Sequence, residues 1–331
     1  MVEFSLGDLN KEISEKSLFL DELKGKICET IVGQNQLINK ILIGILADGH
    51  ILIEGVPGLA KTLTVNTIAK LINTSFKRIQ FTPDMLPADL IGTLIYNQKT
   101  GEFDTRKGPV FSNIILADEI NRTPAKVQSA LLEAMQEHQV TIGETSYQLE
   151  RPFLVLATQN PIEQEGTYPL PEAQVDRFMF KLLVGYPEKN AERLVLRMNS
   201  NFESSEEITP LISSNKIIES QNLINKIYVD EKVEDYVLNL IFATRNPSEY
   251  SLSDLENIID FGASPRATIN LIKSAKARAF MDHRGFVTPE DIRYIGSDVL
   301  RHRIILTYEA EAEEITSDDI INRLFEVIEV P

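Results

Sequence analysis

The fold of this 331-residue chain is decided by the stretch Ile51-Leu52-Ile53-Glu54-Gly55-Val56-Pro57-Gly58-Leu59-Ala60-Lys61-Thr62. A short apolar run ends in a turn rich in Gly and Pro, and a Lys-Thr pair follows where a helix is expected to begin. This order of strand, tight loop and helix N-terminus is typical of a phosphate-binding loop. Gly55 and Gly58 let backbone N–H groups point at phosphate oxygens, and the helix N-terminus adds partial positive charge. The stretch therefore predicts a phosphate-binding site.

Two side chains of this stretch carry the expected chemistry. Lys61 can reach the β- and γ-phosphates of a nucleotide, and the Thr62 hydroxyl can bind Mg²⁺. The strict motif has Gly before the lysine, whereas this chain has Ala60. An Ala is acceptable at this position if the residue has helical dihedral angles, which accept a Cβ atom without strain. The alternative is an ordinary turn between a strand and a helix with Lys61 in solvent, so the rest of the chain must distinguish the two.

Composition excludes several classes of protein. The chain has 33 basic and 49 acidic residues, a formal charge of −16. Such a surface repels a phosphate backbone, so nucleic acid is an unlikely partner. The single Cys28 excludes an intrachain disulfide and fits a reducing compartment. No apolar run approaches the roughly 18 residues of a membrane span, and residues 1–16 do not resemble a signal peptide. We therefore expect an acidic cytoplasmic protein with no membrane partner.

The pattern along the chain predicts two domains. Apolar strands alternate with helices as far as residue 186, which predicts an α/β core with a parallel sheet between helices. Two β-hairpins, around residues 93–106 and 139–149, are inserted into it. We expect the nucleotide-binding core, with its N-terminal helices, at 1–186 and an all-α domain at 187–331. The helices expected in the second domain are 189–198, 230–244, 253–261, 265–283, 289–299 and 317–328.

A pair of acids follows another apolar strand of the core. Ile114-Ile115-Leu116-Ala117 is followed by Asp118 and Glu119. A phosphate loop needs a carboxylate to complete the coordination of Mg²⁺, and Asp118 can supply it through the metal's water shell. Glu119 points elsewhere and can polarise a water for attack on the γ-phosphate. The combination favours hydrolysis of a nucleoside triphosphate over transfer of the phosphoryl group to a small molecule, which needs no such glutamate.

Three further polar residues are candidates for the same site. Asn160 follows the strand 153–158 and can bond the γ-phosphate or the attacking water, although Asn-Pro is also a common turn. Arg177 precedes the last strand, and Arg266 opens a helix of the second domain. Either arginine can stabilise charge on the transferring phosphoryl group, or form a surface ion pair worth little. The residues alone leave that choice open.

Together these motifs resemble the MoxR family of AAA+ ATPases over nearly the whole chain. The resemblance rests on the phosphate loop, on Leu116-Ala117-Asp118-Glu119-Ile120-Asn121-Arg122, on Ala130-Leu131-Leu132-Glu133-Ala134-Met135-Gln136-Glu137, on Ala157-Thr158-Gln159-Asn160-Pro161 and on 170–178. The departure at Ala60 is itself similar to that family. The resemblance implies a fold with an AAA+ phosphate-loop core followed by a helical lid.

The resemblance also implies a role for each candidate residue. Asn160 corresponds to sensor 1, Arg177 to an arginine finger that reaches a neighbouring subunit, and Arg266 to sensor 2 on the lid. Asp118 and Glu119 correspond to Walker B. The residues that correspond to the segment against the adenine are Ile31, Val32, Gly33 and Gln34, and those that correspond to Walker A are Gly55, Val56, Pro57, Gly58, Leu59, Ala60, Lys61, Thr62 and Leu63.

From this resemblance we expect an enzyme that hydrolyses ATP with Mg²⁺ and works as a chaperone-like remodeller of protein complexes. The subunits would form a homo-oligomeric ring, a hexamer, with the two hairpins facing the pore or a client. The family implies a client with a von Willebrand factor A (VWA) domain and a role in maturation or metal-cofactor insertion. The alternatives are a nucleic-acid motor, which would need a basic pore hairpin, and a nucleotide-switched scaffold with little turnover. A small-molecule kinase is the least favoured.

Overall fold

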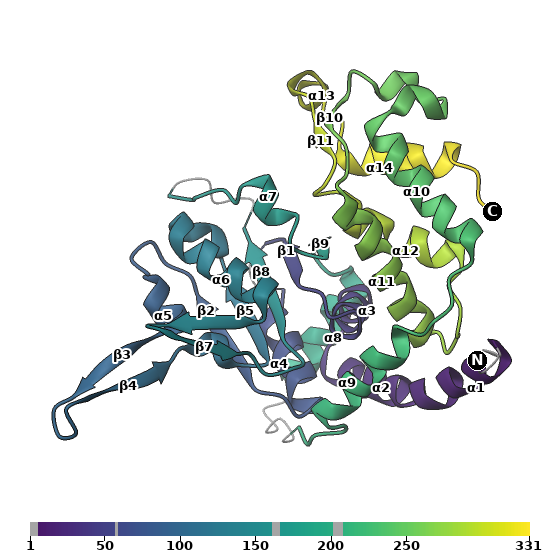
Figure 1. The fold of residues 1–331 in the computed structure, drawn as a ribbon. Coiled ribbons are helices and arrows are strands. Elements are labelled where there is room, and N and C mark those ends of the chain that lie inside the picture. The colour runs from purple at the N-terminus through teal and green to yellow at the C-terminus, as the bar shows by residue number, and fades with distance from the viewer. Residues whose placement is uncertain (1–5, 57–58, 161–165, 201–207) are drawn as a thin grey trace, which may run out of the picture. The chain divides into compact units, whose positions relative to one another are not determined.

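The computed structural model describes residues 6–56, 59–160, 166–200 and 208–331. The chain forms two compact units, coloured by residue number in Figure 1. One, here called the sheet unit, consists of Asp21–Phe178 and Leu182–Glu219. The other, here called the helical unit, consists of the chain up to Leu20, Met179–Lys181 and Ser220–Pro331. No helix among the described residues is both long enough and apolar enough to cross a membrane.

A five-stranded sheet carries the strand ends from which the predicted site residues project. Its order is β2-β5-β8-β1-β9, and the pairs β2/β5, β5/β8 and β8/β1 are parallel. Parallel strands end at the same edge, so β1, β5 and β8 deliver the residues after Glu54, Asp118 and Gln159 to one place. The strands are β1 Ile51–Glu54, β2 Phe76–Gln80, β5 Ile114–Asp118, β8 Leu154–Gln159 and β9 Phe180–Leu183.

Helices cover this sheet because its inner strands β1, β5 and β8 are apolar on both faces. The inner strand β5, between β2 and β8, buries all four residues from Ile114 to Ala117. Alternate residues Ile115 and Ala117 join a cluster formed with Val127 and Leu131 of the next helix, α6. The helix after the phosphate loop, α4, packs against β2 and β5 (Figure 1). The longer helices of the sheet unit are α3 Asn35–Leu46, α4 Lys61–Leu71, α6 Ala125–Glu137 and α8 Lys189–Ser200. Two more, α2 Phe19–Thr30 and α9 Ser214–Ile224, lie mostly in it and extend into the helical unit.

Two antiparallel hairpins project from the sheet unit, as predicted. The first joins β3 Gly92–Asn97 to β4 Glu102–Lys107, and the second joins β6 Gln139–Ile142 to β7 Thr145–Gln148. They touch each other, because a Cβ built on Gly143 would lie 2.7 Å from Cδ1 of Leu94. Between α4 and α6 the short helix α5, Pro87–Ile91, leads into the first hairpin. The inserts therefore form one protruding pair.

A buried histidine joins the strand layer to α6. Nε2 of His50 is 3.0 Å from the carbonyl oxygen of Met135, and the backbone N–H of Val155 donates to its Nδ1 at 3.1 Å. Because Nδ1 accepts a hydrogen bond, the ring is neutral with its proton on Nε2. Burial lowers the pKa of His50 from 6.5 to about 4, more than the bond to Met135 can offset. Protonation of the ring at Nδ1 would place its new N–H donor opposite the N–H donor of Val155.

We expect the sheet unit to lose stability as the pH falls from about 6.5 to about 4 because of His50. In that window the unfolded chain binds a proton that the folded ring excludes, so acid favours unfolding. At pH 5 the loss relative to neutral pH is about 2 kcal/mol, or 1.5 pKa units. A His50→Asn variant keeps an acceptor for Val155 but does not titrate. Urea unfolding at pH 7 and pH 5 should show the variant's deficit shrinking by that amount; a constant deficit would contradict the assignment.

The helical unit is built from amphipathic helices with strong N-terminal caps. Ser264, Thr307 and Thr316 each accept a backbone N–H in the first turn of the helix that follows. The unit also contains one short antiparallel ladder, β10 with β11. Its elements are α1 Leu6–Ser17, α10 Glu231–Arg245, β10 Ile259–Phe261, α11 Pro265–Met281, α12 Pro289–Leu300, β11 Ile305–Leu306, α13 Tyr308–Ala312 and α14 Ser317–Val327.

The predicted helix at 253–261 is wrong. A 3-10 turn, Ser253–Leu255, begins the segment, and Ile259–Phe261 then pairs with Ile305–Leu306. The alternating apolar residues Ile259 and Phe261 fit a strand as well as a helix, and only the distant partner decides between them. The prediction of a parallel α/β core followed by a mainly helical region is confirmed.

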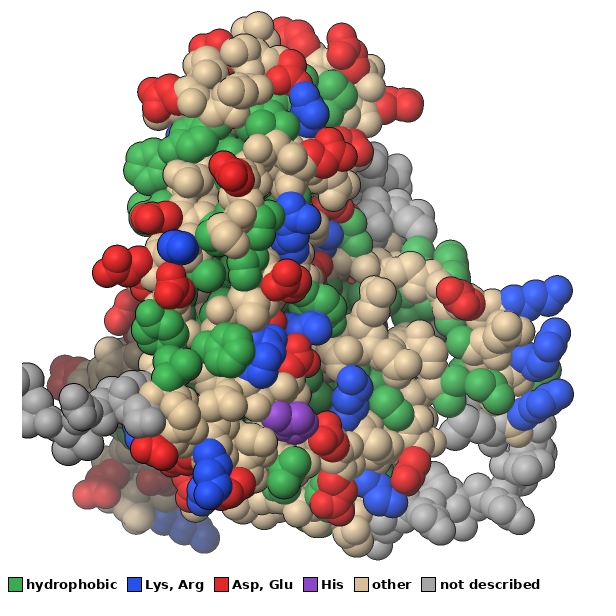
Figure 2. Space-filling model, turned by 90° about the vertical axis from the view of Figure 1, so that its right-hand side faces the viewer, with side chains coloured by type: hydrophobic (Ala, Val, Ile, Leu, Met, Phe, Trp, Pro, Cys, Tyr) green, Lys and Arg blue, Asp and Glu red, His purple; other side chains and the backbone are tan. Residues whose placement is uncertain are grey.

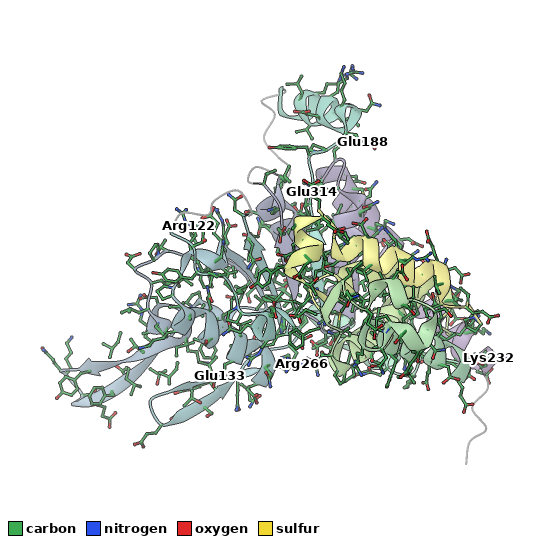
Figure 3. The ribbon with its side chains drawn as sticks, turned by 90° about the horizontal axis from the view of Figure 1, so that it is seen from above. Arg122, Glu133, Glu188, Lys232, Arg266 and Glu314 are labelled. Atoms are coloured by element: carbon green, nitrogen blue, oxygen red, sulfur yellow. The ribbon has the colours of Figure 1, made fainter. Side chains whose placement is uncertain are left out.

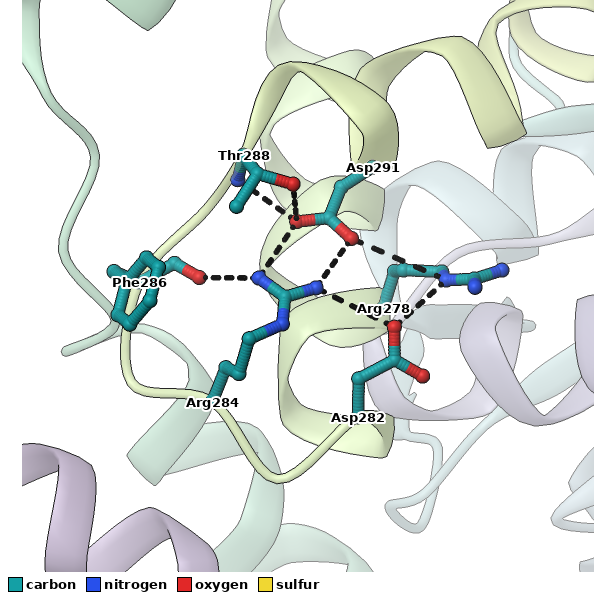
Figure 4. Close-up of polar contacts among 6 residues, drawn as sticks. All are labelled: Arg278, Asp282, Arg284, Phe286, Thr288 and Asp291. Carbon is teal, nitrogen blue, oxygen red and sulfur yellow. Dashed lines mark hydrogen bonds and ion pairs between the residues drawn. The ribbon is translucent and has the colours of Figure 1, made fainter.

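A buried carboxylate fixes the turn between α11 and α12 (Figure 4). Asp291 is 2% exposed, and Nη2 of Arg284 donates to its Oδ1 at 2.7 Å. Its other oxygen accepts the backbone N–H of Thr288 at 2.8 Å, which completes a capping box at the start of α12. Arg284 also lies 3.3 Å from Asp282 at the end of α11. Since the buried charge is both paired and hydrogen-bonded, the turn is held in one shape.

The first helix is bound to this same turn. Oγ of Ser17 lies 2.6 Å from Nδ1 of His283, and the N–H of Gly285 donates to Oδ1 of Asn10 at 2.8 Å. These contacts place α1 in the helical unit, whereas the predicted division groups the N-terminal helices with residues up to 186. The compact units also divide near Glu219 rather than at 186. The domain boundary at 186 stays a prediction.

Candidate nucleotide site

A hollow of about 430 Å³ lies at the ends of β1, β5 and β8. It brings together half of the residues predicted for nucleotide binding and catalysis. Gly55 approaches the chain so closely that a Cβ there would lie 2.4 Å from the carbonyl oxygen of Val184, so only Gly fits. The residues that line the hollow are Gly55, Leu59, Ala60, Lys61, Thr62, Leu63, Arg78, Asp118, Glu119, Thr158, Gln159 and Asn160.

Ala60 does not have the helical dihedral angles that would accept its Cβ atom without strain. Ala60 precedes α4 with φ 52° and ψ 20°, in the left-handed region and not the helical one. A Cβ atom there costs roughly 1–2 kcal/mol, which is why the strict motif uses glycine. The strain is tolerated because the Ala60 carbonyl accepts the N–H of Thr64 at 2.9 Å and its Oγ1 at 3.1 Å, so the turn is fixed by the helix that it opens.

Lys61 is positioned for an anion. Its ammonium group donates to the carbonyl oxygen of Gly55 at 2.7 Å, across the mouth of the loop. Burial lowers the pKa of Lys61, and the nearby charges of Asp118 and Glu119 oppose that shift. A bound phosphate would add negative charge beside a half-buried cation and stabilise its charged form. The lysine, the glycine-lined backbone and the N-terminus of α4 therefore fit a nucleotide phosphate chain.

Asp118 is oriented by two neighbouring strands. Oγ1 of Thr158 on β8 donates to Oδ1 of Asp118 at 2.6 Å, and Nε of Arg78 on β2 donates to Oδ2 at 3.0 Å. Thr62 lines the same hollow. Among the described residues no group of three His, Cys, Asp or Glu side chains is placed to hold a metal. A hydroxyl and one carboxylate fit Mg²⁺, which keeps waters and takes phosphate oxygens as ligands.

The side chain of Glu119, the residue after Asp118, is oriented by its backbone conformation and by two side-chain donors. Glu119 has left-handed dihedral angles, φ 57° and ψ 51°, so the chain turns sharply after β5 and the two carboxylates diverge. Its N–H donates to Oγ1 of Thr158 at 2.9 Å. Its Oε2 accepts from Nε2 of Gln80 at 2.7 Å and lies 3.1 Å from Nη1 of Arg122. The carboxylate is therefore fixed at the rim of the hollow by donors from two elements.

Asn160 lies where the sequence predicts, at the end of β8. It is 9% exposed and lines the hollow with Lys61 and Glu119. The following Pro161 is outside the described residues. An amide beside both the lysine and the glutamate can contact either a γ-phosphate or a water held by Glu119. Its position agrees with the predicted sensor 1 role, which stays a prediction.

The segment predicted to lie against the adenine reaches the phosphate loop. Nε2 of Gln34 donates to the carbonyl oxygen of Leu59, and Ile31 is buried. Gly33 has φ +80°, and a Cβ there would lie 2.5 Å from Cβ of Ala191 on α8. Two other residues predicted to bind the nucleotide are Val32, between Ile31 and Gly33 in the chain, and Val56, which follows Gly55. Pro57 and Gly58, also predicted to bind the nucleotide, are outside the described residues.

Arg177 does not line this hollow. It lines a second one of about 410 Å³, with Glu133, Gln136 and Glu137 of α6 and Gln174 of the short helix α7, Glu172–Val175. Nε of Arg177 is buried without a hydrogen-bond partner. No ion pair joins its guanidinium to any residue in the part of the chain that the structure describes. Figure 3 shows Arg122, the partner of Glu119, and Glu133 on different sides of the sheet unit.

Arg266 belongs to the helical unit. It is the second residue of α11, where its N–H donates to Oγ of Ser264 at 3.2 Å. This confirms that it opens a helix. Its predicted contact with a γ-phosphate stays a prediction.

Four residues that hydrogen-bond or form an ion pair with Asp118 or Glu119 are not predicted from the sequence: Arg78, Gln80, Arg122 and Thr158. Arg78 and Gln80 alternate with Ile79 on β2, whose register sets Gln80 opposite Asp118. The sequence pattern that indicates Arg78 and Gln80 is a pair of polar residues two positions apart in a strand, which places both side chains on one face. This pattern does not show that they face Asp118 and Glu119, because β2 and β5 are far apart in sequence and their pairing is not known from it. The hydroxyl of Thr158 was hidden in an apolar run.

Sheet, loop and paired acids define a phosphate-loop nucleotide-binding unit followed by a helical region. Residues 50–180 match the ATPase family associated with various cellular activities (AAA), and residues 253–324 match the AAA lid domain. The chain is 49% identical over 302 residues to the chaperone MoxR1 of Mycobacterium tuberculosis (strain ATCC 25618 / H37Rv), covering 91% of this chain and 79% of the relative. It is 45% identical over 317 residues to protein YeaC of Bacillus subtilis (strain 168), covering 94% and 96%.

A solved structure of a protein from Cytophaga hutchinsonii ATCC 33406 is similar in both sequence and fold. It has a TM-score of 0.92 and 55% sequence identity, with 97% of this chain and 98% of that chain covered. The chain therefore belongs to the MoxR family of AAA+ ATPases.

Proposed function

We propose that this protein hydrolyses ATP, with Mg²⁺, in a ring whose active sites are shared between neighbouring subunits. The single observation that carries the proposal is that Arg177 and the other predicted catalytic residues of the sheet unit line two different hollows. Lys61, Thr62 and Glu119 line one hollow, whereas Arg177, whose guanidinium has no ion pair within the described ranges, lines another. A guanidinium that contributes to phosphoryl transfer must reach the γ-phosphate, so Arg177 would act on a second copy. A ring gives every site such a neighbour.

The chain's own groups divide the work. Lys61 and the N–H groups at the start of α4 bind the phosphates. Glu119 orients a water and takes its proton, while Asn160 holds that water or the γ-phosphate. Asp118 and Thr62 would hold Mg²⁺, which when bound neutralises charge on the phosphates. Arg266 of the lid would sense loss of the γ-phosphate, so that lid movement follows hydrolysis.

The work done with this energy is proposed to be chaperone-like remodelling of a protein complex, since the relative MoxR1 is named a chaperone. The first hairpin offers a contact for a protein client. Tyr96 and Phe103 pair across it at 5.3 Å between ring centroids, yet are 54% and 65% exposed. Exposed aromatic pairs suit protein partners. We propose a client with a VWA domain and a role in its maturation, including metal or cofactor insertion.

A nucleic-acid motor is less well supported. The second hairpin, from Gln139 to Gln148, contains no Lys or Arg. In the first, Lys107 lies over the rings of Phe111 and Tyr147, at 4.8 and 5.2 Å from their centroids. A lysine that contacts two aromatic rings at the base of a hairpin stabilises the fold and is poorly placed to bind the phosphate backbone of a nucleic acid. A switching scaffold without turnover would not need the water-orienting Glu119.

The shared site is tested by measuring ATP hydrolysis over a series of protein concentrations. We expect turnover per chain to rise with concentration until assembly is complete, and to fall at least about 100-fold when EDTA removes Mg²⁺, because the charge on the phosphates is then unneutralised. Sedimentation of the same samples reports assembly. Turnover per chain that stays constant through a monomer-to-ring transition would contradict a site shared between subunits.

A further inference from the structure

Helix α8, Lys189–Ser200, projects from the sheet unit with its described side chains largely exposed. Leu194 is 48% exposed, Val195 38% and Leu196 69%. Ala191, Leu194 and Val195 share one face at helical spacing, while Lys189, Arg193 and Arg197 follow one another at intervals of four on another. Figure 2 shows, by colour, that exposed hydrophobic and basic side chains occur side by side on the surface of this protein. An apolar and basic helix this exposed is suited to bind a partner surface.

The base of α8 is attached beside the nucleotide site. Cβ of Ala191 lies where a side chain on Gly33 would be, and Pro187 lies 3.8 Å from the same point. Gly33 adjoins Gln34, which donates to the phosphate loop at Leu59. The start of α8 is therefore connected to the phosphate loop through Gly33 and Gln34.

A complementary surface lies around Arg177. Three exposed residues of α6, Glu133, Gln136 and Glu137, line the hollow of about 410 Å³ together with Leu132 and Arg177. They offer two carboxylates and an open concavity, which match the basic and apolar faces of α8. Figure 3 shows Glu133 and Glu188, the residue before α8, on opposite sides of the sheet unit. The two surfaces of one copy therefore face apart, and can meet only between copies.

We propose that α8 of one copy docks on the α6 surface, Ser129–Glu137, of a second copy, next to the point where that copy's Arg177 enters the nucleotide site. This proposal rests on the proposed sharing of the site and names the surface that aligns it. Arg193 and Arg197 meet Glu133 and Glu137, while Leu194 and Val195 cover the apolar part of the hollow. Docking of α8 then couples the segment that contacts the adenine to the arginine of the neighbour.

Charge reversal tests the docking. Arg193→Glu should weaken assembly at least tenfold in the presence of ATP, measured by sedimentation of the full chain, since like charges then face each other. Adding Glu133→Arg to the same chain should recover a substantial part of the loss, because the pair is restored with its signs exchanged. Lys232→Glu, an exposed lysine of α10 with the same change of charge, is the control and should assemble as the parent does. Circular dichroism checks that each variant is folded.

Each result has one meaning. If the parent assembles and Arg193→Glu assembles equally well, α8 is not at the interface, and the shared site of Arg177 is unaffected. If Glu133→Arg gives no recovery, α8 docks elsewhere and the pairing is overturned. If the parent stays monomeric at all concentrations with ATP, both the docking and the shared site fail.

Discussion

Glu119→Gln should bind ATP and lose at least about 100-fold in turnover, because a positioned general base contributes 10²–10⁴ in rate. The amide oxygen of the new side chain can still accept the hydrogen bond from Gln80, so the rim of the hollow keeps its shape. An amide cannot take a proton from the attacking water. Single-turnover hydrolysis with a separate measurement of ATP affinity distinguishes chemistry from binding. Glu102→Gln, on the exposed first hairpin, is the control for loss of one carboxylate.

The same variant gives access to the client. If hydrolysis releases the client, Glu119→Gln in ATP should retain it, whereas the parent in ADP should not. Purified VWA-domain proteins are the probe, and retention that is equal in ATP and ADP would count against an energy-driven cycle. Parent-like turnover by Glu119→Gln would remove Glu119 from the mechanism.

Arg177→Ala should keep ATP affinity and lose at least about 1,000-fold in turnover, the lower end of what an arginine finger contributes. The reason is structural: Arg177 is absent from the lining of its own nucleotide hollow and has a buried Nε without a partner. Its removal leaves the phosphate loop, the acids and Asn160 untouched. Arg323→Ala, an arginine of α14 at 46% exposure, is the matched control and should hydrolyse ATP as the parent does.

Mixing the two inactive variants separates a shared site from a private one. A subunit with Arg177→Ala still has Glu119, and a neighbour with Glu119→Gln still has Arg177. In an even mixture roughly a quarter of the sites in a ring would combine both intact groups, so activity should return to about that fraction. If Arg177 acts within its own subunit, no combination restores a site. Absence of activity in a mixture shown to co-assemble would contradict the trans role.

The sequence predicted those parts of the site that each lie on a single strand and the loop that follows it. The phosphate loop, the acids after β5 and the asparagine after β8 are local patterns, and parallel strands bring such ends together. Arg78, Gln80 and Thr158 act across strands, so their roles depend on the order β2-β5-β8, which no local pattern states. The strain at Ala60 cannot be predicted, because the sequence shows which residue stands at a position but not the sign of its φ.

In the fold, too, the features set by local sequence patterns were predictable and the contacts between distant segments were not. Repeating apolar strands and capped helices were predictable because each follows a local period. The pairing of β10 with β11 and the attachment of α1 to the turn at His283 are contacts between distant segments. A short strand such as Ile259–Phe261 has too few residues to establish a period of its own. These long-range contacts account for the differences between the predicted and observed elements.

The attachment of α1 has a consequence for how the protein is made. Ser17 contacts His283, 266 positions further along the chain, so this contact of α1 can form only after His283 has been translated. At about 5–20 residues per second, that delay lasts tens of seconds at the slower rates. The sheet unit has most of its strands and helices by then and can fold while α1 waits. The helical unit combines residues before Asp21 with residues after Glu219, so it can be completed only after its later helices have been translated.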